Sequence, residues 1–160
     1  MRRWGRTGPV PRSGGTISGV RRLITGVDAN GRSCVVEASA FDFEQLAAGF
    51  GADRFFTTGD SPPPARPPGH GDALDAGVAP GCVTWTMYEC QPGSEYPTHT
   101  TDTIDFDMVV SGTVDLILDD GVHTLGPGDC VVVTGVDHAW RSGPDGYSIS
   151  VVMLGTPHRG

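Results

Sequence analysis

The chain has 160 residues and a mass of 16.7 kDa, a size that suits one domain. Its 19 acidic residues outweigh 11 arginines and no lysine, so the formal net charge is −8, which argues against nucleic acid or an anionic membrane as a partner. No apolar run approaches the ~18 residues of a membrane-spanning helix. The basic N-terminus lacks the apolar stretch of a secretory signal. The four cysteines form no C-x-x-C pair. We therefore expect a cytoplasmic protein with free thiols.

The first forty residues combine a tail with a pair of strands. Residues 1–15 are rich in arginine, glycine and proline, and we expect a flexible N-terminus there, followed by a single domain over residues 16–160. Apolar and β-branched residues at 16–27 and 33–38 predict two strands. The Asn-Gly pair between them is typical of a tight turn, so the two strands are expected to form a hairpin.

The middle of the chain carries a helix signal and then a long loop. Asp42 and Gln45 stand three residues apart, as in a capping box. Apolar side chains recur at helical spacing at Phe43, Leu46, Ala47 and Phe50. One short helix is therefore expected over residues 41–50. Residues 59–81 are rich in proline and glycine, and a loop of this length in a small domain is typical of a surface arm or lid.

From residue 81 onward, strand-like runs alternate with turn signals, which predicts an all-β sandwich or small barrel. The expected strands are 82–90, 94–101, 103–111, 113–118, 122–125, 130–134, 138–141 and 147–154. The signals between them are mainly Pro-Gly, Ser-Gly and Asp-Gly pairs, which favour turns because glycine adopts the backbone conformations that tight turns need.

The segment 97–112 alternates between two chemical characters with a period of two. One face carries polar or ionisable side chains, at His99, Thr101, Thr103, Asp105 and Asp107. The other face carries apolar side chains, at Ile104, Phe106, Met108 and Val110. An ordinary half-buried strand would turn the apolar face to the core and the polar face to water. The alternative arrangement is inverted: the polar face lines a cavity, and the apolar face packs under the N-terminal strands or a second subunit.

Two glycine-framed motifs favour the inverted arrangement. The first places its key residues at Gly93, His99, Thr101, Asp105 and Gly112. The second places them at Gly128, Gly135, His138 and Ser142. These segments, 93–112 and 128–142, resemble the two signature motifs of the cupin superfamily. The His-x-Thr-x-Thr-x-Asp form of the first resembles a subfamily of small single-domain (RmlC-like) cupins. The resemblance implies an all-β fold, a small cupin barrel (double-stranded β-helix or jelly roll) with N-terminal strands and one short helix.

The resemblance also implies a site inside the barrel. In metal-binding cupins, the residues at the positions of His99, Thr101, Asp105 and His138 hold one divalent ion. Here Thr101 replaces a histidine and Asp105 replaces a glutamate. The remaining set of His99, Asp105 and His138 is of the two-histidine, one-carboxylate kind that suits Fe, Zn or Mn. In the metal-free alternative the same three residues are the catalytic acids and bases, because a histidine beside a carboxylate is poised for proton transfer near neutral pH.

Further residues of these strands are expected to bind the substrate. They are Thr101, Thr103, Asp107, Trp140, Tyr96 and Trp85. The threonines would position the ligand by hydrogen bonds, and Trp140, on the strand face of His138, would stack on a flat substrate. Alternation alone does not tell which face of the Trp85 strand points inward.

The favoured function is a small-molecule tailoring enzyme of secondary, polyketide-type metabolism. It would carry out acid–base or metal-assisted lyase or isomerase chemistry, such as decarboxylation, dehydration or cyclisation. The metabolic context comes from the subfamily resemblance and not from the site. The alternatives are an Fe-dependent cupin dioxygenase and a non-catalytic cupin that binds a small molecule. The apolar face at residues 104–110 would need a cover, so we also expect a homodimer.

Overall fold

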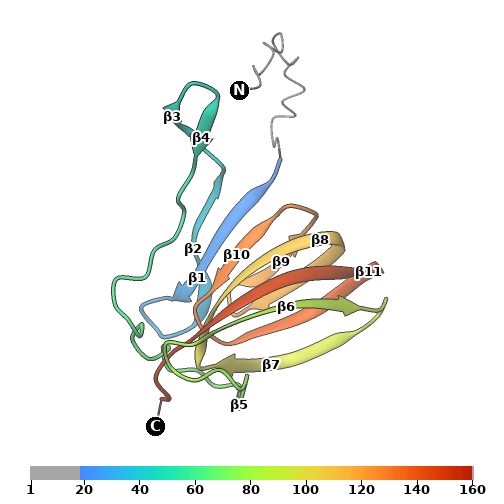
Figure 1. Cartoon of the computed structure of the whole chain (residues 1–160). Helices are drawn as coiled ribbons and strands as arrows, with labels where there is room; N and C mark the ends of the chain where they lie inside the picture. The colour runs from blue at the N-terminus through green and yellow to red at the C-terminus, as the bar shows by residue number, and fades with distance from the viewer. Residues whose placement is uncertain (1–18, 160) are drawn as a thin grey trace, which may run out of the picture.

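Strands and turns make up all the regular structure of residues 19–159, which are the residues that the computed structural model describes (Figure 1). The flexible stretch expected at 1–15 lies outside them. The strands are β1 (Arg21–Val27), β2 (Ser33–Ala40), β3 (Glu44–Ala47), β4 (Phe50–Ala52), β5 (Asp72–Leu74), β6 (Val83–Cys90), β7 (Glu95–Thr101), β8 (Thr103–Leu118), β9 (Gly121–Leu125), β10 (Cys130–Val133) and β11 (His138–Gly155). The described part of the chain includes no helix with the length and hydrophobicity needed to cross a membrane.

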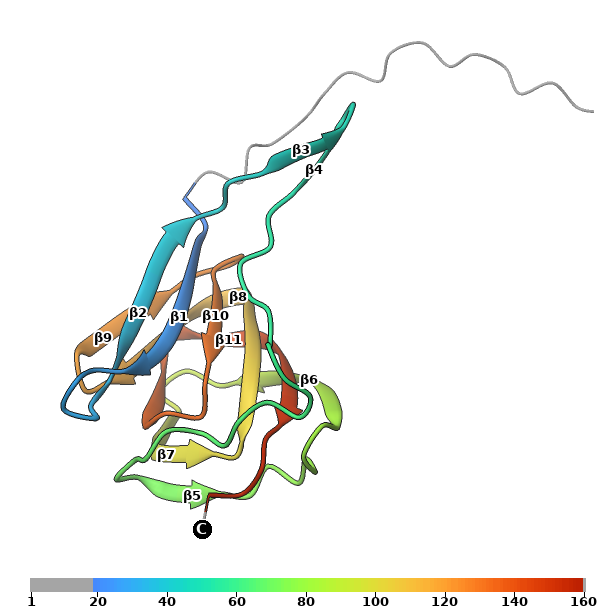
Figure 2. The same ribbon diagram turned by 90° about the vertical axis from the view of Figure 1, so that its left-hand side faces the viewer.

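The main sheet has the strand order β2-β1-β10-β8-β11-β7-β5, with β6 paired to β11 and β9 paired to β8. It curls into a half-barrel because β8 and β11 are long and bent (Figures 1 and 2). The first half of β8 pairs with β10, and its second half pairs with β9. Antiparallel β11 follows β8 through both halves. These two strands therefore contribute to both walls of the curl.

Glycines bend these two strands where turns were expected. Gly112 in β8 and Gly146 in β11 have φ angles of 70° and 74°, in the left-handed region. A Cβ atom on Gly112 would lie 2.1 Å from the carbonyl oxygen of Gly146, so the two backbones touch at the bend. The β8–β11 register shifts at the same place, between Ser142 and Tyr147. The glycine signals consequently mark bends within two long strands and not the ends of four short ones.

The polar face of β8 is the buried one. Asp105 and Asp107 are only 5% and 4% exposed, whereas Met108 and Val110 on the other face are each 46% exposed. Further along the strand the inward face becomes apolar and joins the hydrophobic core. Buried core side chains are Leu23, Val109, Val114, Leu116, Leu118, Leu125, Val131, Val133, Val136, Ile149 and Val151. The curl thus has one end filled with aliphatic side chains and another lined by polar ones.

The helix expected over residues 41–50 is wrong. Residues 44–52 form the β3–β4 hairpin instead, with Gly49 at its turn and Leu46 and Phe50 exposed. The hairpin stands away from the main sheet (Figure 2). A short amphipathic helix is stabilised when its apolar stripe packs on another element. A segment of about ten residues is too short to be a stable helix alone. No such surface lies beside this segment among the described residues.

The loop at 59–81 crosses one end of the curl, and we refer to it as the strap. Its short strand β5 pairs in parallel with β7. The buried Asp137 carboxylate accepts hydrogen bonds from the backbone N–H groups of His70 and Gly71, each at 2.7 Å. Arg66 of the strap pairs with Asp102 at 2.9 Å. Because it is tied at these points, the strap is an ordered wall and not only a surface arm.

Candidate functional site

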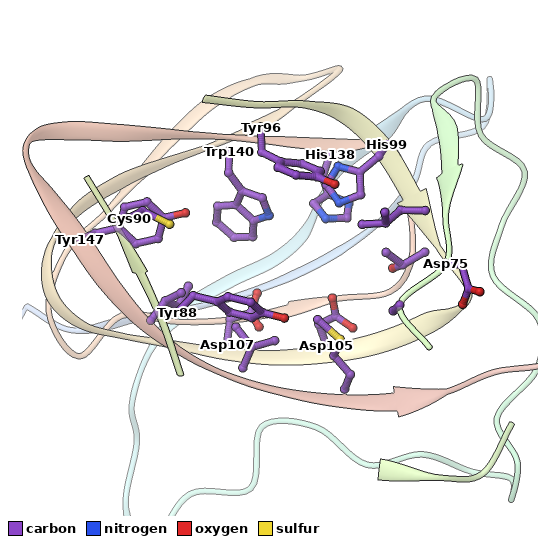
Figure 3. A pocket seen from close by; sticks show the side chains of 16 residues that line it. Asp75, Tyr88, Cys90, Tyr96, His99, Asp105, Asp107, His138, Trp140 and Tyr147 are labelled. Atoms are coloured by element: carbon purple, nitrogen blue, oxygen red, sulfur yellow. The ribbon is translucent and has the colours of Figure 1, made fainter. Parts of the chain in front are cut away.

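A cavity of about 420 Å³ occupies the polar end of the curl (Figure 3). Strands β7 and β11 carry one wall, with the side chains of His99, His138 and Trp140. The first half of β8 carries the facing wall, with Asp105 and Asp107. The strap closes one end with residues 74–76. The cavity is within the usual size of small-molecule sites, which is ~300–1,000 Å³.

The two motif histidines lie side by side on one wall. His99 of β7 and His138 of β11 are directly paired across the strands, and their ring centroids are 4.1 Å apart. A glycine permits the chain to reach this place: Gly135 has a φ of 73°, and a Cβ atom there would lie 2.4 Å from the carbonyl oxygen of Thr101. The two distant motifs therefore meet at their histidines.

Backbone carbonyl groups determine the tautomer of both rings. The Nδ1–H group of His99 donates to the carbonyl oxygen of Pro97 at 2.9 Å, and that of His138 donates to Val136 at 2.8 Å. A carbonyl oxygen only accepts, so each Nδ1 must carry the proton and each neutral ring keeps a lone pair on Nε2. Burial, together with the neighbouring His99, lowers the pKa of His138 to about 4. Burial also lowers the pKa of His99. At neutral pH both rings are uncharged and both Nε2 atoms can accept a proton.

Burial shifts the pKa values of the carboxyl groups on the opposite wall upward, because it disfavours their charged form. Asp105 and Asp107 are two residues apart on β8, so both side chains point into the cavity. One oxygen of each, Oδ1, is buried without a hydrogen-bond partner among the described residues. Burial raises the pKa of Asp105 to about 6, and burial together with the charge of Asp105 raises that of Asp107 well above its ordinary value. The wall therefore holds at least one carboxylic acid near neutral pH, able to donate a proton.

Aromatic rings complete the lining. Trp140 packs edge-on against His138 with ring centroids 5.9 Å apart, and Tyr96 packs edge-on against His99 at 4.8 Å. Tyr88 and Tyr147 lie at the other side of the cavity (Figure 3). A flat ligand between the two walls would thus meet aromatic faces as well as ionisable groups.

Seven of the nine predicted site residues line this cavity: His99, Thr101, Asp105, Asp107, His138, Trp140 and Tyr96. Two do not. Trp85 lies on the outer face of β6, 76% exposed, and its Nε1–H group donates to Ser150 at 2.7 Å. Thr103 is buried and borders a separate cavity of about 230 Å³ beside the strap.

Other lining residues were missed by the sequence analysis. Tyr88 and Cys90 share the face of β6 opposite to Trp85, and Tyr147 is the cross-strand partner of Cys90. Alternation in β6 separates these two faces but does not tell which is inside; the pairing of β6 with β11 decides it. Asp75 lies in the strap, where the sequence has no periodicity that could have identified it.

The residues present do not fit the expected three-ligand metal site. His99 and His138 share a wall, but Asp105 stands across the cavity from them (Figure 3). Thr101 stands where metal-binding cupins have a further histidine ligand, and its hydroxyl group is a poor ligand for these metals. Within residues 19–159, no three His, Cys, Asp or Glu side chains are grouped so that they could hold a metal ion. Within the described residues His99, Asp105 and His138 are therefore not grouped as a metal site, and the chemistry below uses none.

Comparison with protein families identifies the region that contains this site. Residues 86–154 match the family described as "Cupin domain". Among curated proteins, the chain is 38% identical over 64 residues to "Phomopsin biosynthesis cluster protein C'" and to "Phomopsin biosynthesis cluster protein D", both from Diaporthe leptostromiformis. Each match covers 39% of this chain and 34% of the relative. The chain thus spans about a third of the length of the curated relatives it matches.

Two solved structures are also similar to part of the chain. One is a polyketide cyclase from Streptomyces resistomycificus, with 25% identity, a TM-score of 0.42, and coverage of 44% of this chain and 53% of the other. The second is a sugar phosphate isomerase from Silicibacter pomeroyi, with 25% identity, a TM-score of 0.42, and coverage of 47% and 52%.

Proposed function

We propose that the cavity, most of whose lining falls in the region 86–154 that matches the cupin family, is the active site of an enzyme that moves protons on a small oxygenated organic molecule. One observation carries this proposal. Two neutral imidazoles face two carboxyl groups whose pKa values are raised, across a cavity large enough for a substrate between them. Acids and bases whose environments push their pKa values apart are typical of general acid–base catalysis.

The proposed step is an enolisation. A histidine Nε2 atom takes a proton from the carbon next to a substrate carbonyl group, and the electron pair of that C–H bond moves to form a C=C bond. The carbonyl oxygen receives a hydrogen bond or a proton from the carboxyl group of Asp107 on the opposite wall. Return of the proton from the imidazolium to another carbon of the enol gives isomerisation. Dehydration follows instead when the imidazolium gives that proton to a hydroxyl group on the neighbouring carbon, whose C–O bond breaks to release water as the enol electrons form the new C=C bond. The histidine pair and the carboxyl pair thus play complementary roles on the two faces of one substrate.

We further propose that the enzyme acts in secondary metabolism. The two curated relatives are named as proteins of a phomopsin biosynthesis cluster, and each is 38% identical to this chain over 64 residues. That similarity supports a tailoring role for this chain in a biosynthetic pathway. Binding of a small molecule without turnover is the second candidate, favoured by the unpartnered carboxyl oxygens, which a ligand alone could satisfy.

The enolisation proposal can be tested without knowing the natural substrate. The probe is 2-acetonaphthone in D₂O, a flat methyl ketone whose methyl protons exchange slowly unless a base is placed beside them. We expect the protein to accelerate exchange of the methyl protons for deuterium, followed by NMR, and His138→Ala to lose roughly 100-fold or more of that acceleration. Trp85→Phe, on the outer face, serves as the control and should exchange at the wild-type rate. Equal exchange by wild type and His138→Ala would remove the histidine wall from the mechanism. Binding of the probe with no exchange by wild type would favour the non-catalytic candidate.

A further inference from the structure

The charges around the cavity are of one sign. The acidic side chains in its lining are Asp75, Asp105 and Asp107, whereas none of the described arginines lines it. The chain has no lysine. The two histidines, whose Nδ1 protons are held by backbone carbonyls, present lone pairs and not N–H groups to the interior. An anionic group in the cavity would therefore lack a cationic partner among the described residues.

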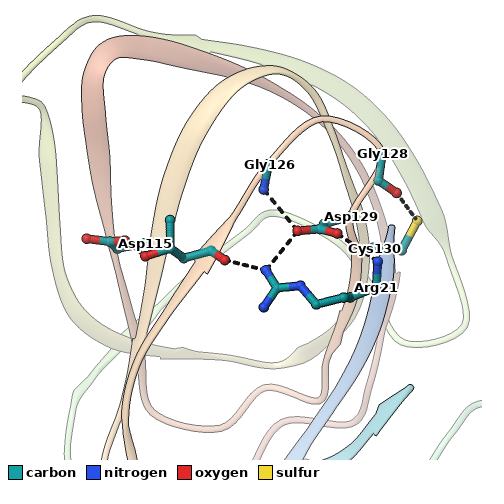
Figure 4. A network of polar contacts seen from close by, with 7 residues as sticks. Arg21, Asp115, Gly126, Gly128, Asp129 and Cys130 are labelled. Carbon is teal, nitrogen blue, oxygen red and sulfur yellow. Dashed lines mark hydrogen bonds and ion pairs between the residues drawn. The ribbon is translucent and has the colours of Figure 1, made fainter. Parts of the chain in front are cut away.

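Six of the seven arginines among the described residues make contacts elsewhere in the fold, and the seventh, Arg54, is exposed. Arg21, for example, pairs with Asp129 at 2.9 Å, and Gly126 donates its backbone N–H to the same carboxylate (Figure 4). The other arginine contacts are Arg22 with Asp53, Arg66 with Asp102, Arg141 with Asp115, Arg32 with the carbonyl of Asp119, and Arg159 with the carbonyl of Arg66. Moving one of these guanidinium groups to the cavity would break such a contact.

The uncharged part of the lining is aromatic and aliphatic. Tyr96 and Trp140 stand on the histidine wall, and Ile149, Val151 and Met153 of β11 add apolar surface beside the carboxyl wall. A ligand that buries most of its surface here would lose its water and gain mainly apolar and aromatic contacts. Such a lining stabilises a ring system and leaves an anion poorly solvated.

The carboxyl pair also presents a hydrogen-bond donor to the cavity. Asp105 and Asp107 occupy successive inward positions of one strand, and each has a buried Oδ1 atom without a partner. Two such carboxyl groups cannot both ionise cheaply in a low-dielectric wall. At least one therefore offers an O–H donor, which matches the carbonyl or hydroxyl oxygen of a neutral ligand.

We infer that the cavity selects uncharged aromatic ligands that carry a carbonyl or hydroxyl oxygen, and that its carboxyl wall excludes anionic ones. This inference rests on the proposed function only for the assumption that the substrate occupies this cavity. It narrows the substrate class: carboxylates and phosphate esters are rejected, and ketones and phenols that carry aromatic rings are accepted.

Three probes that share a naphthalene ring system test the inference by calorimetric titration at pH 7.5: 2-naphthol, 2-naphthoate and 2-naphthylmethylammonium. We expect 2-naphthol to bind at least roughly tenfold more tightly than the other two, because it alone carries no charge to desolvate. Binding of 2-naphthoate or the ammonium probe as tightly as 2-naphthol would overturn the inference, and so would absence of binding by 2-naphthol.

A matched pair of variants locates the source of the exclusion. Asp105→Asn removes a carboxyl group from the wall, and Asp115→Asn removes one that pairs with Arg141 outside the cavity. We expect Asp105→Asn to bind 2-naphthoate roughly tenfold more tightly than wild type, and Asp115→Asn to leave it unchanged. Equal effects of the two variants on 2-naphthoate binding, or no effect of either, would overturn the role of the carboxyl wall. If Asp105→Asn fails to fold, the comparison of the three probes on the wild-type protein still tests the inference. Turnover is not measured, so a protein that binds 2-naphthol but fails to exchange protons keeps this inference and loses the proposed function.

Discussion

Individual ionisable residues of this cavity are held in the forms that burial favours. A buried imidazole avoids charge by giving up its proton, and a buried carboxyl group avoids charge by keeping one. His138 and Asp105 show both effects: burial lowers the pKa of the first to about 4 and raises that of the second to about 6. The same physical cause therefore produces a base on one wall and an acid on the other.

The raised pKa of Asp105 predicts how the stability of the protein depends on pH. The folded pKa of Asp105 is about 6, above its ordinary value of 3.8, so the folded state binds more protons than the unfolded state between these values. Raising the pH through this window must therefore reduce the free energy of unfolding. Asp105→Asn abolishes that loss, so its melting temperature should exceed that of wild type by more at pH 7.5 than at pH 4. His138 makes a contribution to the free energy of unfolding that increases as the pH rises from about 4 to 6.5. This contribution is present in both proteins, so it cancels in the difference between their melting temperatures. A difference in melting temperature that shrinks as the pH rises would contradict the assignment.

Among the secondary elements, the strap is the one whose attachment shapes the cavity. Its residues 74–76 form one end of the lining, and β5 holds them beside β7. Asp137 lies one residue before His138 and bonds to two backbone N–H groups of the strap. The residue that ties the strap and the residue that faces the substrate are thus neighbours at the start of β11.

Asp137→Ala should loosen the strap without unfolding the sheet. The variant leaves two N–H groups unpaired, which costs roughly 1–3 kcal/mol of stability. We expect hydrogen exchange to accelerate at residues 69–76, while amides in β8 and β11 keep their wild-type protection. Trp85→Phe is again a suitable control, because its side chain is remote from the strap's anchoring bonds. Uniformly faster exchange throughout the sheet would mean that Asp137 supports the whole fold and not the strap in particular.

At the scale of the whole molecule, the outer face of the sheet is apolar and only partly covered. Of the face expected to need a cover, Ile104 is buried and Phe106 packs edge-on against Phe56 with centroids 5.6 Å apart. Met108 and Val110 remain exposed, and Trp85 on β6 lies in the same outward layer. Exposed apolar patches of this kind are typical of interfaces.

We therefore expect the protein to form a homodimer through this outer face. Light scattering coupled to size-exclusion chromatography should give twice the chain mass at micromolar concentration. The double variant Met108→Lys/Trp85→Lys should elute as a monomer, because two buried charges would face each other across a symmetric interface. Val122→Lys, an exposed position on β9, provides the matched control and should remain dimeric. A monomeric wild type would show that the patch has another purpose.

Several parts of this structure could be predicted from local patterns. The strand pair at the N-terminus and the run of strands after residue 81 follow from residue alternation and turn signals. The inward polar face of β8 was expected from the resemblance of the two motifs, because alternation alone left both faces open. The histidines of the two motifs meet as the resemblance to the cupin motifs implied. The helix at 41–50 failed because its apolar stripe has no surface to pack on. Asp105 lies across the cavity from His99 because the chain turns at Asp102, between β7 and β8.

The sequence by itself determined which side chains share a strand face, where glycines permit left-handed backbone, and which charges the chain has available. Each of these depends on a residue and its immediate neighbours. Tertiary structure alone decided that Tyr88 and not Trp85 faces inward, that Asp105 opposes the histidines, and that the strap ends the cavity. Those outcomes depend on pairing between strands about sixty residues apart, such as β6 with β11. An alternation of period two distinguishes the two faces of a strand, but only its packing partners establish which face is the interior.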